Sequence, residues 1–207
     1  MDEQVLRSLV KWPNVPHCFG WLALDRRGQW RMRDEYAQAN QLPGNVIQHV
    51  ALNDFISRNY AHDSLGRYFF QNGPQRVFVT LDATPWIARM IPCQGGKNPL
   101  QLLTQCGTPI DPQGTLSDEL GNIYITGTIA QSLSDQVGSN VFTQEQPISV
   151  ALLHDHDLDL FSEQAKVQED ACSFKGVWHW DGKDLAIEPI HSAELSERFQ
   201  FIKKPNN

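Results

Sequence analysis

The sequence predicts an α+β fold with antiparallel, hairpin-rich sheets and two or three short helices. The main observation is a turn pattern that recurs along the chain. Asp at the first position and Gly at the fourth is the preference of a type I turn, and a short strand follows each example. The turns are Asp25–Gly28, Asp63–Gly66, Asp118–Gly121 and a shorter Asp181–Gly182. Asn72-Gly73, a preferred dipeptide of two-residue hairpins, supports the same fold class.

The first third of the chain alternates helix and strand. Residues 5–10 predict a short helix that two following prolines end. Residues 19–24 and 29–33 read as strands joined by the first Asp turn. Asn53 is a suitable N-cap for a helix that runs to about Tyr60.

The remainder is mostly β structure. Apolar residues alternate with polar ones over 76–81, the period of a strand with one buried face. Pro74 cannot donate to a ladder, so we place it at the start of this strand or on a sheet edge. Residues 149–153 are apolar, residues 158–165 have helical spacing, and residues 178–190 return to β structure.

Length and charge limit the classes of protein. The 207 residues suit a single compact domain, 1–207, or two intimate β-rich halves of about 1–92 and 101–207. The net charge of −7 argues against duplex nucleic acid or an anionic membrane as a partner. No apolar run approaches the roughly 20 residues of a membrane helix, and the acidic N-terminus lacks a secretory signal. We therefore expect a cytoplasmic protein.

The sharpest chemical cluster lies in the segment LHDHDLD. In an extended chain His154 and His156 point the same way, and two imidazoles at this spacing suit a transition metal. Further ligands would come from elsewhere, with His179, His191 and Cys172 as candidates by residue type. The alternative is a helix that begins near Asp155, where capping and the helix dipole favour acidic residues without any metal.

Aromatic residues suggest a second site. We expect a surface for a ligand or a protein partner on the hairpin that follows the second Asp turn, formed by Tyr68, Phe70, Arg76, Phe78 and Trp86. The structural alternative for such aromatics is core packing. The motifs of phosphate loops, dinucleotide-binding turns, nucleophile elbows and zinc proteases are absent from the sequence.

Four segments of the chain resemble an uncharacterised proteobacterial family known only as a domain of unknown function. They are WPNVPHCFGWLALDRRGQWRMRD, RNYAHDSLGRYFFQNGPQRVFVTLDATPWIARM, ALLHDHDLDLF and WHWDGKDLAIEPI, and the resemblance runs from about Trp12 to Phe201. The order of elements over residues 20–125 is also similar to a second uncharacterised bacterial family, with a TPVEK-type turn and an APF-type segment. Neither resemblance implies catalytic residues.

Three functions remain open. The sequence favours a non-catalytic cytoplasmic binding or adaptor protein that recognises a protein partner or a small metabolite, because it shows no coherent set of acid, base and nucleophile. The first alternative is a metal-dependent hydrolase centred on His154 and His156. The second is a self-associating structural protein that pairs through an edge strand near Pro74. The sequence identifies no cofactor.

Overall fold

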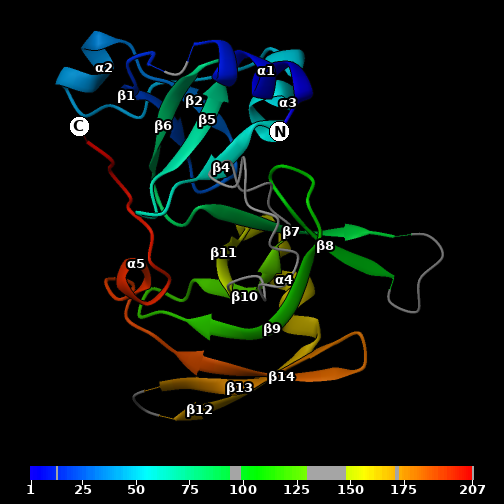
Figure 1. The fold of residues 1–207 in the computed structure, drawn as a ribbon. Helices are drawn as coiled ribbons and strands as arrows, with labels where there is room; N and C mark the ends of the chain where they lie inside the picture. Colours follow the sequence, from blue (N-terminus) through cyan, green and yellow to red (C-terminus); the bar gives the residue numbers. More distant parts are fainter. Residues whose placement is uncertain (13, 94–98, 130–147, 171–172, 207) are drawn as a thin grey trace. The chain divides into compact units, whose positions relative to one another are not determined.

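The computed structural model describes residues 1–12, 14–93, 99–129, 148–170 and 173–206 (Figure 1). These residues form two compact units. Among them, unit 1 comprises residues 1–85 and 200–206, and unit 2 comprises residues 86–129 and 148–199. Most of the segment between the two expected halves, residues 94–98, lies outside the described residues.

Unit 1 contains a six-stranded sheet with the order β3-β2-β1-β6-β5-β4. The strands are β1 (Cys18–Leu24), β2 (Trp30–Met32), β3 (Asn45–Val46), β4 (Tyr60–His62), β5 (Tyr68–Asn72) and β6 (Gln75–Leu81). β1 and β6 pair in parallel at the centre, and the other neighbours are antiparallel. The segment near Pro74 therefore leads into an interior strand, not an edge strand as the self-association hypothesis requires.

Three helices accompany this sheet: α1 (Glu3–Lys11), α2 (Glu35–Ala39) and α3 (Val50–Arg58). Asp34 caps α2 by accepting the Ala37 N–H at 2.8 Å. The predicted cap of the third helix is wrong, because α3 begins three residues before Asn53. The His49 ring accepts the Leu52 N–H at 3.1 Å, whereas the Asn53 amide donates to the Ile47 carbonyl.

The hairpin between β5 and β6 turns one residue later than its dipeptide predicts. Asn72 pairs with Gln75, so Gly73 and Pro74 are the two central residues of the turn. Gly73 has a φ of 57°. Gly at the first central position is the requirement of a type II′ turn, and the second position does not need the N–H that proline lacks.

Unit 2 contains an eight-stranded sheet with the order β12-β13-β14-β9-β10-β11-β7-β8. Its strands are β7 (Trp86–Pro92), β8 (Leu100–Thr104), β9 (Ile110–Ser117), β10 (Ile123–Ile129), β11 (Ser149–Leu153), β12 (Ala165–Asp170), β13 (Ser173–Trp180) and β14 (Lys183–Pro189). β7 pairs with β11, and β9 with β14, in parallel. The α+β class is confirmed, but both sheets are mixed instead of purely antiparallel.

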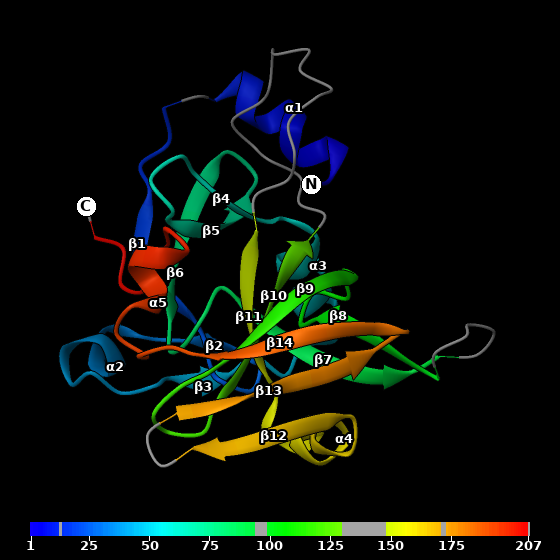
Figure 2. The same cartoon turned by 90° about the horizontal axis from the view of Figure 1, so that it is seen from below.

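Short helical segments complete unit 2. The 3₁₀ turn η2 (Asp155–Asp157) leads directly into α4 (Leu158–Glu163), and α5 (Leu195–Arg198) follows β14. Figure 2 shows β12, β13 and β14 side by side, with α4 next to β12. The prediction of two or three helices omitted α2 and α5, which have only five and four residues and thus little periodicity to detect.

Each unit has its own apolar interior. Phe69 and Phe78 are fully buried in unit 1, and Trp178 and Ile125 are fully buried in unit 2. The longest helices in the described part of the chain, α1 and α3, have nine residues each, so none of the helices there reaches the length of a membrane span.

Candidate functional site

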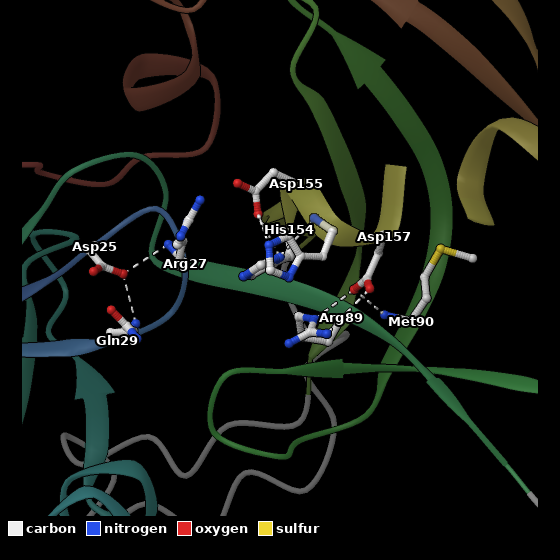
Figure 3. Close-up of polar contacts among 9 residues, drawn as sticks. Asp25, Arg27, Gln29, Arg89, Met90, His154, Asp155 and Asp157 are labelled. Atoms are coloured by element: carbon white, nitrogen blue, oxygen red, sulfur yellow. Dashed lines mark hydrogen bonds and ion pairs between the residues drawn. The ribbon is translucent and has the colours of Figure 1, made fainter. Parts of the chain in front are cut away.

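The recurring Asp turns share one hydrogen-bond geometry. In the first, Asp25 Oδ1 accepts the N–H groups of Arg27 and Gln29, each at 2.9 Å (Figure 3). The Gly28 N–H bonds to the Asp25 carbonyl at 3.1 Å, and Gly28 has a φ of 76°. The second carboxylate oxygen accepts Arg31 Nε at 2.7 Å. One buried carboxylate thus closes the turn and also binds the strand that follows it.

The same arrangement recurs at two other places. Asp63 Oδ1 accepts two backbone N–H groups at 3.0 Å and its Oδ2 accepts Arg67 Nε at 2.8 Å. Asp118 Oδ1 accepts two backbone N–H groups at 2.9 Å. Its Oδ2 accepts neutral donors instead of an arginine, namely Asn122 Nδ2 and Tyr124 Oη, both at 2.7 Å.

Hydrogen bonds dominate the electrostatics of the third turn. Burial by itself raises the pKa of Asp118, but the bonds from Asn122, Tyr124 and the backbone outweigh that effect and lower the pKa. The neighbouring Glu119 accepts the Ser192 hydroxyl at 2.5 Å and the Ser192 N–H at 2.9 Å. These bonds lower the pKa of Glu119 to about 2.

Two turns differ from this pattern. Asp181 and Gly182 are the central residues of the β13–β14 hairpin, with φ values of 47° and 74°, as in a type I′ turn. Sequence reasoning missed a turn at Thr104, where Oγ1 takes the place of the carboxylate. It accepts the N–H groups of Cys106 and Thr108 at 3.3 and 3.1 Å. The spacing of Thr104 and Gly107 is the signal that would have found it.

The aromatic residues expected to form a surface lie in the interior. Tyr68, Phe70, Phe78 and Trp86 expose between 0 and 7 % of their surface. Their strands, β5, β6 and β7, each have a hydrogen-bonded neighbour on both sides, and these side chains fill the interior of their own unit, where a partner cannot reach them. Arg76, the polar member of the set, is half-buried, and its guanidinium lies 4.5 Å from the centre of the Phe69 ring.

The histidine pair lies where β11 ends and η2 begins. His154 is the N-cap of η2, and its Nδ1 accepts the His156 N–H at 3.1 Å. The segment is a turn, not the extended strand that the spacing argument assumed. The two imidazoles nevertheless lie together, with 4.8 Å between ring centres. The helix start proposed as the alternative is therefore present, and it does not separate the rings.

Asp155 joins these two side chains. Its Oδ1 is 2.9 Å from His154 Nδ1 and 4.0 Å from His156 Nε2. One donor atom of each residue lies within 4.8 Å of the others, which is the one such group of three within the described ranges. His179 bonds to Asp184 at 2.6 Å and His191 lies near Glu119, so neither belongs to the group. Cys172 lies outside the described residues.

Asp157 has a separate, structural role. Its Oδ2 accepts Arg89 Nε at 2.7 Å and the Met90 N–H at 2.9 Å (Figure 3). The carboxylate is buried and fixes η2 to the middle of β7. Desolvation by burial, followed by repulsion from the Arg89 guanidinium, lowers the pKa of His154.

Unit 1 contains a groove of about 580 Å³, within the usual size range of ligand sites. β1, α2 with the residues after it, the end of β6 and the C-terminal segment supply its walls. The Leu81 N–H donates to the Lys203 carbonyl at 2.8 Å, which holds the C-terminal wall against β6. This groove was not predicted from the sequence, because the segments that line it are distant along the chain.

Three charged residues line this groove: Arg33, Asp82 and Lys204. Arg33 Nε donates to the Leu42 carbonyl at 3.1 Å, which fixes the base of the guanidinium. Asp82 is partly exposed, but protein atoms displace part of the water around its carboxyl. This desolvation and the nearby Asp25 carboxylate raise the pKa of Asp82. Arg31, Arg33 and Arg26 act in the opposite direction but do not cancel this rise. The groove thus offers two cationic groups and one carboxyl group.

Comparison with known proteins yields a family but no activity. No curated protein matches the chain significantly. Two solved structures of DUF1285 family proteins show partial similarity. The one from Silicibacter pomeroyi DSS-3 is 14% identical, with a TM-score of 0.47 over 88% of this chain and 87% of that chain. The one from Shewanella baltica OS155 is 13% identical, with a TM-score of 0.40 over 69% of this chain and 91% of that chain.

A family model supplies the assignment that these structures do not. The model DUF2944, described as "Protein of unknown function (DUF2946)", matches residues 1–206, and the chain therefore belongs to this family.

Proposed function

We propose that the chain is a non-catalytic cytoplasmic binding protein, and that its ligand is a small zwitterionic metabolite held in the unit 1 groove. The observation that carries the proposal is the placement of Arg33, Lys204 and Asp82 around one groove of about 580 Å³. A carboxylate or phosphate group would pair with the two cations. A protonated amine would pair with Asp82 and relieve the poor solvation that raises its pKa.

The other candidate functions have less support. A protein partner would need an exposed apolar surface, and the aromatic residues expected to supply it are buried. Self-association through the strand near Pro74 would need an edge, and β6 has a neighbour on each side. A metal-dependent hydrolase first requires a metal site, and a metal site alone does not supply the acid and base of a hydrolase.

Thermal melts of the full-length protein would test the groove. The ligand panel contains amino acids and short peptides, together with matched amines and carboxylic acids that carry only one of the two charges. A zwitterion at about 100 times its dissociation constant should stabilise the fold by about 2.7 kcal/mol. For a chain of this size that raises Tm by about 5–10 °C. The single-charge analogues should give clearly smaller shifts.

Matched variants locate the binding. Arg33→Gln and Asp82→Asn each remove one charge from the groove and should abolish most of the shift. Arg7→Gln and Asp54→Asn make the same changes at exposed helical positions of unit 1 that do not line the groove and should leave it intact. A panel without any shift, or a shift that survives both groove variants, would refute the proposal.

A further inference from the structure

We propose that His154, Asp155 and His156 form a binding site for one divalent transition-metal ion of the zinc type. The proposal is independent of the unit 1 groove and uses only residues of unit 2. It differs from the sequence hypothesis in its third ligand, which is the adjacent Asp155 and not a distant histidine or cysteine.

The three donors lie within 4.8 Å of one another, and the two distances that involve Asp155 are close to those of a metal site. Metal–ligand bonds of about 2.0–2.1 Å in a tetrahedral site place neighbouring donor atoms roughly 3.3 Å apart. Asp155 Oδ1 already lies 2.9 Å from His154 Nδ1 and 4.0 Å from His156 Nε2. Rotation of the two more exposed side chains, Asp155 and His156, would close the difference. Their side chains are 50 % and 69 % exposed, so solvent leaves room for this rotation.

The surroundings provide one fixed ligand and two adjustable ones. His154 is 5 % exposed and is held at the end of β11, whose last residues pair with β7. Its Nδ1 accepts the His156 N–H, and a bound ion would displace that single bond. Such an arrangement allows an ion to enter from the exposed side and to be held by a buried imidazole.

Charge also favours the site. The Arg89 guanidinium acts electrostatically on His154, and Asp157 pairs with Arg89 through two contacts of 2.7 and 3.4 Å. The repulsion that Arg89 would exert on a metal ion is therefore largely compensated. Two imidazoles and one carboxylate form a ligand set found in catalytic zinc sites, in which the fourth position holds water. Nickel, copper and cobalt ions also accept such ligands.

Calorimetric titration with Zn²⁺ would test this site on full-length protein that a chelator has freed of metal. Visible absorption with Co²⁺ as the probe reports the ligand geometry independently of any activity. We expect one ion per chain. His156→Ala and Asp155→Asn should each weaken binding at least about 100-fold, more than residues that only orient a metal ligand do. His156 is mostly exposed, so its variant should fold normally, which circular dichroism checks.

His191→Ala is the matched control. His191 is an exposed histidine with a carboxylate, Glu119, at 3.8 Å, but it has no third donor in the described structure. Its removal should leave Zn²⁺ affinity unchanged. Three results would each overturn the proposal: no stoichiometric binding, equal affinity of wild type and His156→Ala, or a loss of affinity in His191→Ala as large as that in His156→Ala.

Discussion

The Asp118 turn should contribute much more to stability than the Thr104 turn, although the two backbones are alike. Both turns belong to unit 2, and each closes through two N–H groups that bond to one side-chain oxygen. The difference lies in the acceptor. Asp118 offers a second, charged oxygen that also accepts Asn122 Nδ2 and Tyr124 Oη, whereas the Thr104 hydroxyl is neutral.

Asp118→Ala and Thr104→Val should differ by about 2 kcal/mol in how far they lower the free energy of unfolding. Hydrogen bonds to a charged group contribute about 1.5–3 kcal/mol, and a buried donor left without an acceptor costs about 1–3 kcal/mol. Tyr124 is only 2 % exposed, so its hydroxyl would lose the charged acceptor Asp118 Oδ2 without gaining full hydration. We therefore expect Asp118→Ala to lower the free energy of unfolding by about 3 kcal/mol. Thr104→Val keeps the side-chain shape and should cost about 1 kcal/mol.

Urea denaturation measures this difference directly. With a slope of roughly 2 kcal/mol per molar, a gap of 2 kcal/mol separates the two midpoints by about 1 M. The slopes of wild type and variants should agree, because neither substitution changes the surface exposed on unfolding. Equal midpoints for Asp118→Ala and Thr104→Val would refute the argument that the second carboxylate oxygen makes the turn strong.

Two further predictions follow from the turns and their neighbours. Gly66→Ala should cost at least about 2 kcal/mol more than Gly121→Ala in urea denaturation, because a Cβ at Gly66 would lie 2.0 Å from the Gln200 carbonyl oxygen, whereas Gly121 has no heavy atom within 4 Å. Similar losses would contradict the contact with Gln200. The lowered pKa of Glu119 stabilises the fold above pH 4.5, and this contribution should disappear as the pH falls from 4.5 towards 2. In Glu119→Gln the fall of Tm over that range should be shallower, and an unchanged slope would show that the Ser192 bonds contribute nothing.

Local patterns made the turns predictable. The turn is specified by an Asp and a Gly three residues apart, followed by a short apolar stretch. This short pattern is sufficient because the hydrogen bonds that close the turn join residues within one five-residue segment. The Thr104 turn was missed because hydroxyl acceptors are weaker and more common outside turns. The resemblance to an uncharacterised family is confirmed at the level of a family of unknown function.

Features that depend on distant residues were not predictable. The parallel pairing of β1 with β6 joins residues 57 or 59 positions apart, such as Leu24 and Leu81, and nothing in either strand specifies it. Asp155 was assigned to a helix start, and its approach to both imidazoles arises from a 3₁₀ turn that the alternating His-Asp pattern does not reveal. The groove brings Asp82 and Lys204 together through the Leu81–Lys203 bond, which periodicity cannot anticipate.

The C-terminal segment has a consequence for folding during synthesis. Residues 200–206 belong to unit 1, and the Gly66 and Leu81 bonds to Ile202 and Lys203 need them. All of unit 2 is translated between these parts, which at about 5–20 residues per second takes roughly 6–20 s. Unit 1 therefore cannot complete its fold until the ribosome has translated unit 2. Until then the last N–H group of β6, that of Leu81, lacks its bond to the Lys203 carbonyl. An early domain that only late residues can complete has high contact order and a long exposure to chaperones.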